Sequence, residues 1–327
     1  MAKNICVIDS EGAEELMQHI QAGNGVEISH IVMGINSYAA GIADQVFDRY
    51  RAAGGDTFDT ARMYYGGECD RMLGEYVRKR GIRSQVKVCM KGCYPLEQSK
   101  MYLARLAPED IRGDLEKSLR AFGTDYADLY LLHRDDPARP VEEIVPVMDA
   151  LVREGKARAV GVSNWTCGRI AQANAFAREN GLTPFTVSQL HFSLALTTPP
   201  LTGDITHVPM NATEQMWYEE TGMTIMAFAS QGKGFFAQYQ AGGAYKPTVK
   251  AYYTSIPENL RRAGRCVEVG EKYGVSATVI ALAYLLRHPL HPAAMCTYSK
   301  ISQYEDSMRA LEIPLTAAEV RYLETGK

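Results

Sequence analysis

The chain has 327 residues, of which 46% are hydrophobic and 22% charged, values that are ordinary for a soluble globular protein. Its 35 basic and 38 acidic residues give a net charge of −3, which gives no reason to expect nucleic acid or an anionic membrane as a partner. No apolar run approaches the roughly 18 residues that a membrane span requires.

Short apolar runs alternate with amphipathic runs along most of the chain. In chain order they predict a strand at 31–35, a helix at 42–51, a strand at 57–59, a helix at 69–79, a strand at 86–90, a helix at 108–121, a strand at 127–132, a helix at 141–153, a strand at 157–162, a helix at 167–178, a strand at 186–190, a helix at 211–220, a strand at 224–228, helices at 259–273 and 276–287, a strand at 293–297 and a helix at 302–311.

Eight strand–helix units with short connections are typical of a parallel sheet covered by helices. Over this length they favour closure into an α/β fold of the (β/α)8 TIM barrel type. No GxGxxG pattern follows the first strand, which weighs against an open dinucleotide-binding sheet.

Residues 25–327 contain no linker or low-complexity segment, so they are predicted to form one barrel domain. Residues 1–24 are predicted to be an N-terminal extension, with a strand-like run at 5–8 and an amphipathic run at 14–20. The segment 235–257, after the seventh strand, is predicted to be a long loop. Loops of that size are usually functional or mobile.

The seven cysteines are scattered, which fits a reducing cytoplasm. The closest pair, Cys89 and Cys93, has three residues between its members. We interpret it as two small residues in or beside a strand rather than as a metal or redox pair, and we expect no metal. The N-terminus has only a short apolar run before acidic residues, which is not the pattern of a signal peptide.

Four side chains that can carry chemistry follow or end the apolar runs: Asp59, Tyr64, Lys91 and His133. The carboxyl ends of strands are where an α/β barrel places its reactive groups. A tyrosine in water, with a pKa of about 10, is a poor acid near neutral pH. A neighbouring ammonium such as Lys91 favours its phenolate and eases proton release.

In this interpretation Asp59 pairs with Lys91, and His133 polarises a carbonyl as negative charge develops on its oxygen. Each residue also has a simpler interpretation. Asp59 can be a helix cap, Tyr64 rim packing, Lys91 a solvated side chain, and His133 part of a charge cluster with Arg134-Asp135-Asp136. The four in register at strand ends favour a carbonyl reductase.

The chain resembles the aldo-keto reductase superfamily over residues from about Val26 to Leu323. The resemblance rests on Phe58-Asp59-Thr60-Ala61 with Tyr64 and Gly74, on the run from Leu131 to Pro137, and on the run from Gly155 to Trp165. It implies a (β/α)8 barrel that binds a nicotinamide dinucleotide without a Rossmann fold. It also implies that Tyr64 is the general acid, assisted by Asp59, Lys91 and His133.

The resemblance further implies that Ser163, Asn164 and Gln189 hold the nicotinamide carboxamide, since two amides and a hydroxyl supply donors and acceptors to that group. Phe228 either stacks on the nicotinamide or is a core residue. The small residues after it would let backbone amides approach the pyrophosphate. The full set of expected cofactor contacts is Asn36, Asp59, Ser163, Asn164, Gln189, Phe228, Ala229, Ser230, Gln231, Gly232, Ser299, Lys300, Gln303 and Ser307.

Two parts of this set depart from the family pattern. Many relatives have Ser-Pro-Leu where this chain has Ala229-Ser230-Gln231. Relatives that prefer NADP often place Arg or Lys where this chain has Thr297, Ser299 and Gln303, and only Lys300 is basic in that stretch. Paired cations hold a 2′-phosphate best. NADP(H) is favoured by resemblance, and NAD(H) stays a competitor.

The first loop, with Asn36, Ser37 and Tyr38, is expected at the barrel mouth. The other expected substrate residues are Tyr65, Arg134, Trp165, His191 and Phe235. Aromatics mixed with Arg, His and hydroxyls favour a polyhydroxylated or aromatic carbonyl, and a sugar-derived one in particular. The sequence leaves the natural substrate, the reaction direction and the oligomeric state open.

Two other functions make different predictions. A cofactor-binding regulatory or interaction subunit with little turnover would bind the dinucleotide but reduce no carbonyl. A barrel hydrolase or isomerase would use Asp59 and His133 without a dinucleotide, and it would leave Ser163, Asn164 and Gln189 without a role.

Overall fold

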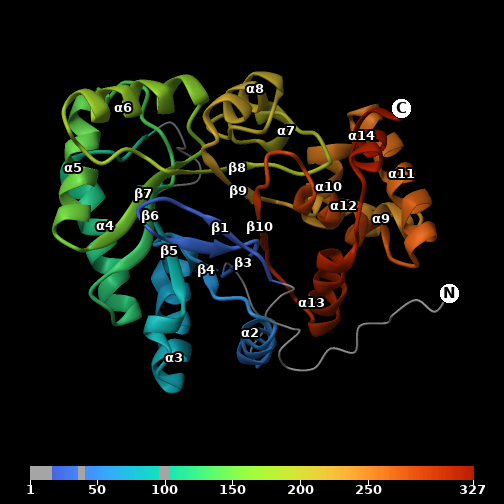
Figure 1. Cartoon of the computed structure of the whole chain (residues 1–327), viewed down its shortest axis with the longest axis horizontal. Coiled ribbons are helices and arrows are strands. Elements are labelled where there is room, and N and C mark those ends of the chain that lie inside the picture. Colours follow the sequence, from blue (N-terminus) through green and yellow to red (C-terminus); the bar gives the residue numbers. More distant parts are fainter. Residues whose placement is uncertain (1–16, 36–40, 96–102) are drawn as a thin grey trace.

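A computed structural model describes residues 17–35, 41–95 and 103–327. Eight parallel strands close into a barrel in the order β10-β3-β4-β5-β6-β7-β8-β9, which confirms the predicted (β/α)8 architecture (Figure 1). Their bounds are β3 Ile31–Gly34, β4 Thr57–Asp59, β5 Lys87–Gly92, β6 Ala127–Leu132, β7 Ala157–Ser163, β8 Val187–His191, β9 Thr224–Phe228 and β10 Ala293–Cys296.

The helices surround this barrel (Figure 1). Their bounds are α2 Ala43–Ala52, α3 Glu68–Arg80, α4 Pro108–Phe122, α5 Val141–Arg153, α6 Cys167–Glu179, α7 Pro199–Thr202, α8 Ala212–Thr221, α9 Phe235–Gln240, α10 Pro247–Val249, α11 Pro257–Tyr273, α12 Ala277–Leu286, α13 Ile301–Met308 and α14 Ala317–Thr325. The bounds of β4, β6, α5 and β9 coincide with the predicted ones, and most others differ by one or two residues.

Side chains alternate between the two faces of each barrel strand. In β6, Leu129 and Leu131 belong to the cluster inside the barrel, whereas Tyr130 and Leu132 pack with the helices. The hydroxyl of Tyr130 donates to the carbonyl of Ile111 in α4 (2.8 Å), which ties this strand to the helical layer. Both faces of the strands are therefore buried, and the sequence shows near-continuous apolar runs for that reason.

Gly74 in α3 permits a close helix–helix approach. A Cβ added there would lie 2.0 Å from the carbonyl oxygen of Phe122 at the end of α4. No side chain fits in that space, which gives a physical reason for glycine at this position.

A two-stranded hairpin closes the amino end of the barrel. Strands β1 (His19–Gln21) and β2 (Glu27–Ser29) pair antiparallel, and Ala22, Val26 and Ile28 pack on the barrel interior (Figure 1). The hairpin spans the predicted boundary at residue 24, and its first strand includes the end of the predicted amphipathic run. The run at 5–8 lies outside the described residues.

The segment 235–257 after β9 is more regular than the loop predicted for it. It contains α9, α10 and a π-helical turn, η5 (Lys250–Thr254). These pieces are too short to show a helical period in the sequence. Phe235, Phe236, Val249 and Tyr253 are buried in the core, so packing rather than local periodicity specifies this segment.

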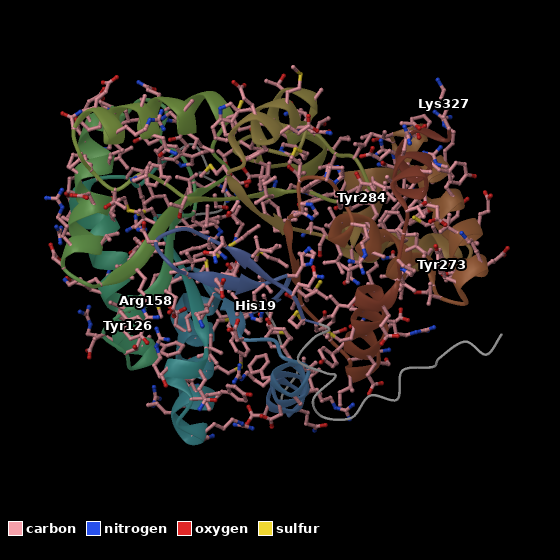
Figure 2. The ribbon with its side chains drawn as sticks, in the orientation of Figure 1. His19, Tyr126, Arg158, Tyr273, Tyr284 and Lys327 are labelled. Carbon is pink, nitrogen blue, oxygen red and sulfur yellow. The ribbon has the colours of Figure 1, made fainter. Side chains whose placement is uncertain are left out.

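Polar anchors join the carboxyl-terminal helices. The hydroxyl of Tyr273 in α11 donates to Glu319 of α14 (3.0 Å), and that of Tyr284 in α12 donates to Glu324. Figure 2 labels the two tyrosines. Among the described residues, no single helix is both long and apolar enough to cross a membrane. Helices α11 and α12 meet that criterion only as a pair, and the chain bends by 94° between them.

Candidate active site

A cavity of about 1020 Å³ opens at the carboxyl end of the barrel, opposite the hairpin. Its wall includes residues at or after the ends of β4, β6, β7, β8, β9 and β10, together with residues of α13. Because all the strands are parallel, residues far apart in sequence meet at this one edge. The expected catalytic residues Asp59, Tyr64 and His133 lie on the wall.

A buried acid–base pair lies at the base of the cavity. Nζ of Lys91 contacts Oδ1 of Asp59, and Nε2 of Gln189 donates to the other carboxylate oxygen (2.8 Å). Strand β5 extends two residues past its predicted end, so Lys91 lies inside it. Burial disfavours the ammonium, but Asp59 and Tyr64 outweigh burial and raise the pKa of Lys91 above its ordinary value. Lys91 is therefore charged near neutral pH.

Tyr64 begins a short 3-10 turn, η1 (Tyr64–Gly67), directly above this pair. Its ring centroid lies 5.2 Å from Nζ of Lys91 and 5.8 Å from the His133 ring, which meets it edge-on at 82°. Burial raises the pKa of Tyr64, and the ammonium of Lys91 offsets only part of that increase. Lys91 acts in the direction expected from the sequence, but desolvation is larger, so Tyr64 is a neutral phenol here.

His133 follows β6, and its backbone N–H donates to the carbonyl of Gly92 (2.9 Å). Burial, then the charges of Arg134 and Lys91, hold the pKa of His133 well below its usual range, so the imidazole is neutral. Its buried Nδ1 has no hydrogen-bond partner in the part of the chain that the structure describes. A neutral imidazole carries one N–H, which can donate to a ligand oxygen.

The three residues expected to hold a carboxamide all line the cavity. Asn164 has a left-handed backbone (φ 58°), and its Nδ2 donates to Oγ of Ser163 (3.0 Å). Its Oδ1 accepts from the backbone N–H of Val208 (3.3 Å). Gln189 uses one amide hydrogen on Asp59, which leaves its second hydrogen and its carbonyl oxygen for another group.

The end of β9 and the segment after it supply the next part of the wall: Phe228, Ala229, Ser230 and Gln231. Nε2 of Gln231 donates to Oγ of Ser307 in α13 (2.8 Å), so the two expected contact regions are joined. Ser299 and Gln303 also line the wall and bond to each other, since Oε1 of Gln303 accepts from the Ser299 hydroxyl (2.9 Å).

Two expected cofactor residues are not on the wall. Gly232 is buried behind it, and Lys300 is exposed away from it at the start of α13. Two other lysines, Lys233 and Lys246, line the cavity instead. Both belong to the irregular segment after β9, and a single sequence gave no direction for their side chains.

The expected substrate residues divide into three groups. Tyr65 and Arg134 line the cavity. Asn36, Ser37 and Tyr38 lie outside the described residues. Trp165, His191 and Phe235 do not line the cavity and correct the prediction, because their rings pack in the surrounding core.

The contacts of these three residues show why. Trp165 packs edge-on against Phe185 (5.6 Å between centroids), and Phe235 stacks on Tyr245 (5.6 Å). His191 lies beside Phe228, and its Nε2 bonds with the hydroxyl of Tyr253 (3.1 Å).

Sequence reasoning missed several wall residues, which are Tyr94, His207, Lys233, Lys246, Thr278 and Asp306. His207 comes from the Pro-rich stretch before α8, where Asp204 pairs with Arg134 (3.1 Å) and lies 3.4 Å from Nε2 of His207. The one sequence feature that could have indicated these wall residues was the cluster of polar residues in the Pro-rich connection before α8. Among the described residues, no group of three His, Cys, Asp or Glu side chains is arranged to hold a metal ion.

Comparison with known proteins identifies the family. The profile of the Aldo/keto reductase family matches residues 33–325. The chain belongs to the aldo/keto reductase family. The family resemblance seen in the sequence is thereby confirmed, and the family supports oxidoreduction between a carbonyl and an alcohol on small molecules.

Individual relatives are distant in sequence, and the matches cover most of this chain. An aryl-alcohol dehydrogenase of Pestalotiopsis microspora is 27% identical over 303 residues, covering 90% of this chain and 74% of the relative. A norsolorinic acid reductase of Emericella nidulans is 30% identical over 285 residues, covering 85% and 70%. A 6-dehydroglucose reductase of Agrobacterium fabrum is 28% identical over 327 residues, covering 95% and 99%.

Proposed function

We propose that this protein is an NAD(P)(H)-dependent oxidoreductase that interconverts an aldehyde or ketone and its alcohol, with Tyr64 as general acid and base. The observation that carries the proposal is the group around Tyr64. A charged lysine and a neutral histidine flank one phenol on the wall of a large cavity. Each of the three has a separate part in moving one proton.

In reduction, the hydroxyl of Tyr64 gives its proton to the carbonyl oxygen. Lys91 opposes the cost of leaving a phenolate in a buried place, and Asp59 keeps the lysine charged and in position. The neutral imidazole of His133 donates a hydrogen bond to the same oxygen as charge develops there. In alcohol oxidation the same groups act in reverse.

The wall of the cavity fits a nicotinamide dinucleotide, which supplies or accepts the hydride when bound. Its volume is sufficient for a large ligand. Ser163, Asn164 and Gln189 offer amide and hydroxyl groups near Tyr64, and Ser299, Gln303 and Ser307 offer more on another part of the wall. The Thr278 hydroxyl is buried on this wall without a partner among the described residues, as expected for a group that meets a ligand.

We favour NADP(H), with NAD(H) as the competitor. The cation for a 2′-phosphate would be Lys246 rather than Lys300, because Lys246 lines the cavity. Titration of protein fluorescence with NADPH tests this: Lys246→Met should weaken NADPH binding about tenfold, the size of one charge-assisted contact. NADH binding should not change. Lys300→Met is the matched comparison, and a loss confined to that variant would restore the assignment made from the sequence.

The proposed substrate is a hydroxylated carbonyl compound, with a sugar-derived one favoured. Tyr65, Tyr94, Arg134 and His207 line the cavity together, and they offer hydroxyl, guanidinium and imidazole groups beside aromatic faces. The relative named 6-dehydroglucose reductase, matched over almost its whole length, supports this choice. We also infer one domain over residues 25–327 and, from the free cysteines, a cytoplasmic location.

Replacement of Tyr64 by Phe tests the main proposal. Carbonyl reduction should fall by about 10²–10⁴-fold, the usual contribution of general acid–base catalysis. The dissociation constant of NADPH should be unchanged, because the phenol is proposed to act on the substrate oxygen. Tyr94→Phe removes a hydroxyl from the same wall and should cost far less.

Two outcomes would contradict this assignment. Full activity in Tyr64→Phe would exclude the tyrosine as proton donor. Cofactor binding by the unaltered protein without turnover of any aldehyde, ketone or alcohol would favour the alternative, a regulatory or interaction subunit.

A further inference from the structure

Lys233 is a cation on the cavity wall without an acidic partner. It lies in the turn η4 (Gly232–Gly234), and it forms no ion pair with any described residue. Its Nζ lies 5.4 Å from the centroid of the Tyr252 ring. The side chain of Lys233 is exposed and borders the open cavity. A lysine ammonium that is open to the cavity and has no acidic partner is available to donate to an anionic ligand.

The backbone holds Lys233 in an unusual conformation. Its φ is 52°, and the glycines on either side also have positive φ (58° and 86°). A lysine gains nothing locally from the left-handed region, where glycine is favoured. Such strain persists where the surrounding structure enforces it, and it collects at ligand sites. It therefore marks the position of the Lys233 side chain as a constrained feature of the cavity.

Lys233 belongs to the part of the cavity that contains Phe228. The ring of His207 lies 5.8 Å from that of Phe228, and the ring of His191 lies 5.3 Å from it. The charge of Lys233, after burial, helps to lower the pKa of His207 to about 4 and that of His191 to about 3. The ammonium is therefore within electrostatic reach of both imidazoles, on the side where Arg134 also acts on His207.

Another cation of the cavity wall, Arg134, is already neutralised. Nη2 of Arg134 lies 3.1 Å from Oδ2 of Asp204, and the Asp204 carboxylate also accepts from the backbone and hydroxyl of Thr206 (2.9 and 2.6 Å). The Arg134–Asp204 pair can therefore give a ligand hydrogen bonds and packing contacts, but it contributes little net charge to the cavity wall. Lys233 gives this part of the wall its unbalanced positive charge.

We propose that Lys233 binds an anionic group of the substrate, a carboxylate, sulfonate or phosphate attached to the aldehyde or ketone. Lys233 is thus a specificity residue, and the enzyme prefers acidic carbonyl compounds to neutral ones of the same shape. The proposal rests on the proposed carbonyl reduction and narrows its substrate class.

Two probe aldehydes isolate the charge. In 4-carboxybenzaldehyde and 4-nitrobenzaldehyde the groups opposite the carbonyl have nearly the same planar shape, but only the carboxylate is anionic. We expect Lys233→Met to lower kcat/KM for 4-carboxybenzaldehyde by about 10–100-fold, the effect of losing a hydrogen bond to a charged group. For 4-nitrobenzaldehyde the change should stay within about twofold, as for a substitution that removes no contact to the substrate.

Two further variants serve as controls. Lys233→Arg should keep most of the preference for the carboxylate. Lys250→Met removes an exposed lysine that is not on the cavity wall, and it should change neither aldehyde's kcat/KM.

Two results would overturn the proposal. An equal loss for both aldehydes, with a raised dissociation constant for NADPH, would assign Lys233 to the cofactor phosphates. An unchanged ratio of the two aldehydes would remove Lys233 from anion recognition altogether.

Failure of the reductase assignment is distinguishable from these results. If the unaltered protein reduces neither aldehyde, calorimetric titration with the alcohol 4-(hydroxymethyl)benzoate still tests the anion site. Binding that Lys233→Met abolishes would support the site, and binding that it leaves unchanged would overturn it.

Discussion

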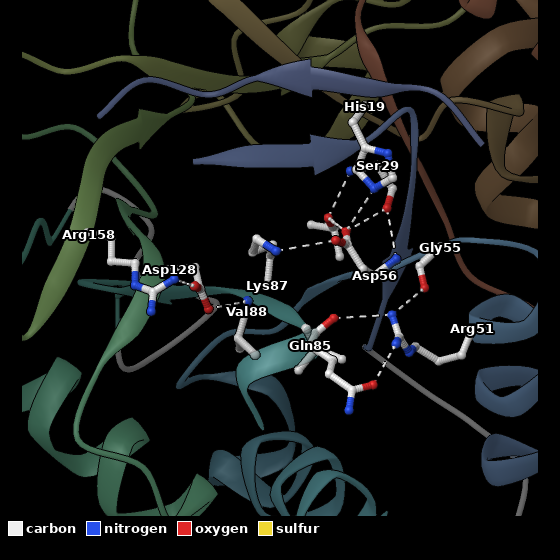
Figure 3. Close-up of polar contacts among 12 residues, drawn as sticks. His19, Ser29, Arg51, Gly55, Asp56, Gln85, Lys87, Val88, Asp128 and Arg158 are labelled. Atoms are coloured by element: carbon white, nitrogen blue, oxygen red, sulfur yellow. Dashed lines mark hydrogen bonds and ion pairs between the residues drawn. The ribbon is translucent and has the colours of Figure 1, made fainter. Parts of the chain in front are cut away.

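An Asp–Lys ion pair lies at each end of strands β4 and β5. The two ends differ in how many of their buried polar groups have hydrogen-bond partners. At the amino end, Nζ of Lys87 lies 3.3 Å from Asp56, whose carboxylate also accepts from the hydroxyls of Ser29 and Thr57 (2.9 and 2.8 Å) (Figure 3). At the carboxyl end, Lys91 and Asp59 form a fully buried ion pair, and Gln189 donates a hydrogen bond to Asp59.

The surroundings of the two pairs differ. Nearby at the amino end, the buried Asp128 accepts from the backbone of Val88 (2.9 Å) and pairs with Arg83 and Arg158 (both 3.0 Å) (Figure 3). At the carboxyl end, by contrast, His133 and Thr278 keep buried polar atoms without partners in the described chain.

Backbone strain is also more frequent at the carboxyl end, although Asn24 in the hairpin turn has a positive φ as well. Of the seven non-glycine residues with positive φ in the described chain, four line the cavity: Tyr65, Asn164, Ala229 and Lys233. Asp56 and Asp128 are saturated at the amino end, where Nε2 of His30 is an exception, whereas unsatisfied groups and strained residues are more numerous at the end where a ligand is expected. The comparison separates a structural ion pair from a candidate catalytic one on the same two strands.

The largest expected effect comes from replacing the lysine of each ion pair, Lys91 or Lys87, by Met. Lys91→Met leaves the Asp59 carboxylate buried without its cation, which should lower the free energy of unfolding by about 3–5 kcal/mol. Lys87→Met removes a partly exposed partner from a carboxylate with several other donors, and should cost about 0–1 kcal/mol. Urea denaturation measures both. Similar losses for the two variants would mean that the ends are energetically equivalent.

An intermediate effect is expected from acid. Burial holds the pKa of His191 at about 3, against an ordinary value of about 6.5. Below pH 6.5 His191 of the unfolded chain takes up a proton, whereas His191 of the folded chain stays neutral. The free energy of unfolding therefore decreases as the pH is lowered, until the pH reaches the pKa of the folded state.

At pH 5 this histidine alone should cost about 2 kcal/mol relative to pH 7.5. His191→Gln keeps a hydrogen-bonding group for Tyr253 and removes the titration, so its urea midpoint should fall less between those pH values. A fall as steep as that of the unaltered protein would exclude His191 as a contributor.

The smallest effect concerns the amino-end network. The hydroxyl of Ser29 donates to Asp56 and accepts from its backbone N–H (2.9 Å each). Ser29→Ala should cost about 1 kcal/mol, the net value of a hydrogen bond. Carbonyl reduction and cofactor binding should not change, because the contact lies at the opposite end of the barrel. A change in either property would show that the two ends are coupled.

Short windows of sequence were enough to predict many of the strands and helices. Strands such as β6 are apolar because both faces are buried, and α5 begins after Pro140, so both could be placed from short windows. Asp59, Tyr64, Lys91 and His133 could be proposed together because parallel strands bring their carboxyl ends to one edge. That reasoning needs the order of the strands but no side-chain coordinates.

Other features depended on distances between segments far apart in the chain. The choice of Lys233 and Lys246 over Lys300 depends on side-chain direction in an irregular segment. The packing of Trp165 against Phe185 and of His191 beside Phe228 depends on which neighbours fill the core. The hairpin at the amino end closes the barrel by packing with interior side chains from seven of the eight strands. No single window of sequence contains all of these residues.

By itself, therefore, the sequence determined the strand–helix alternation, the family and the chemical types near the strand ends, because each of these is written in short runs of residues. Only the tertiary structure decided which polar groups are saturated and which remain open. It also decided that burial, rather than Lys91, controls the pKa of Tyr64. Desolvation and hydrogen-bond completion depend on every atom packed around a group, and those atoms come from the whole chain.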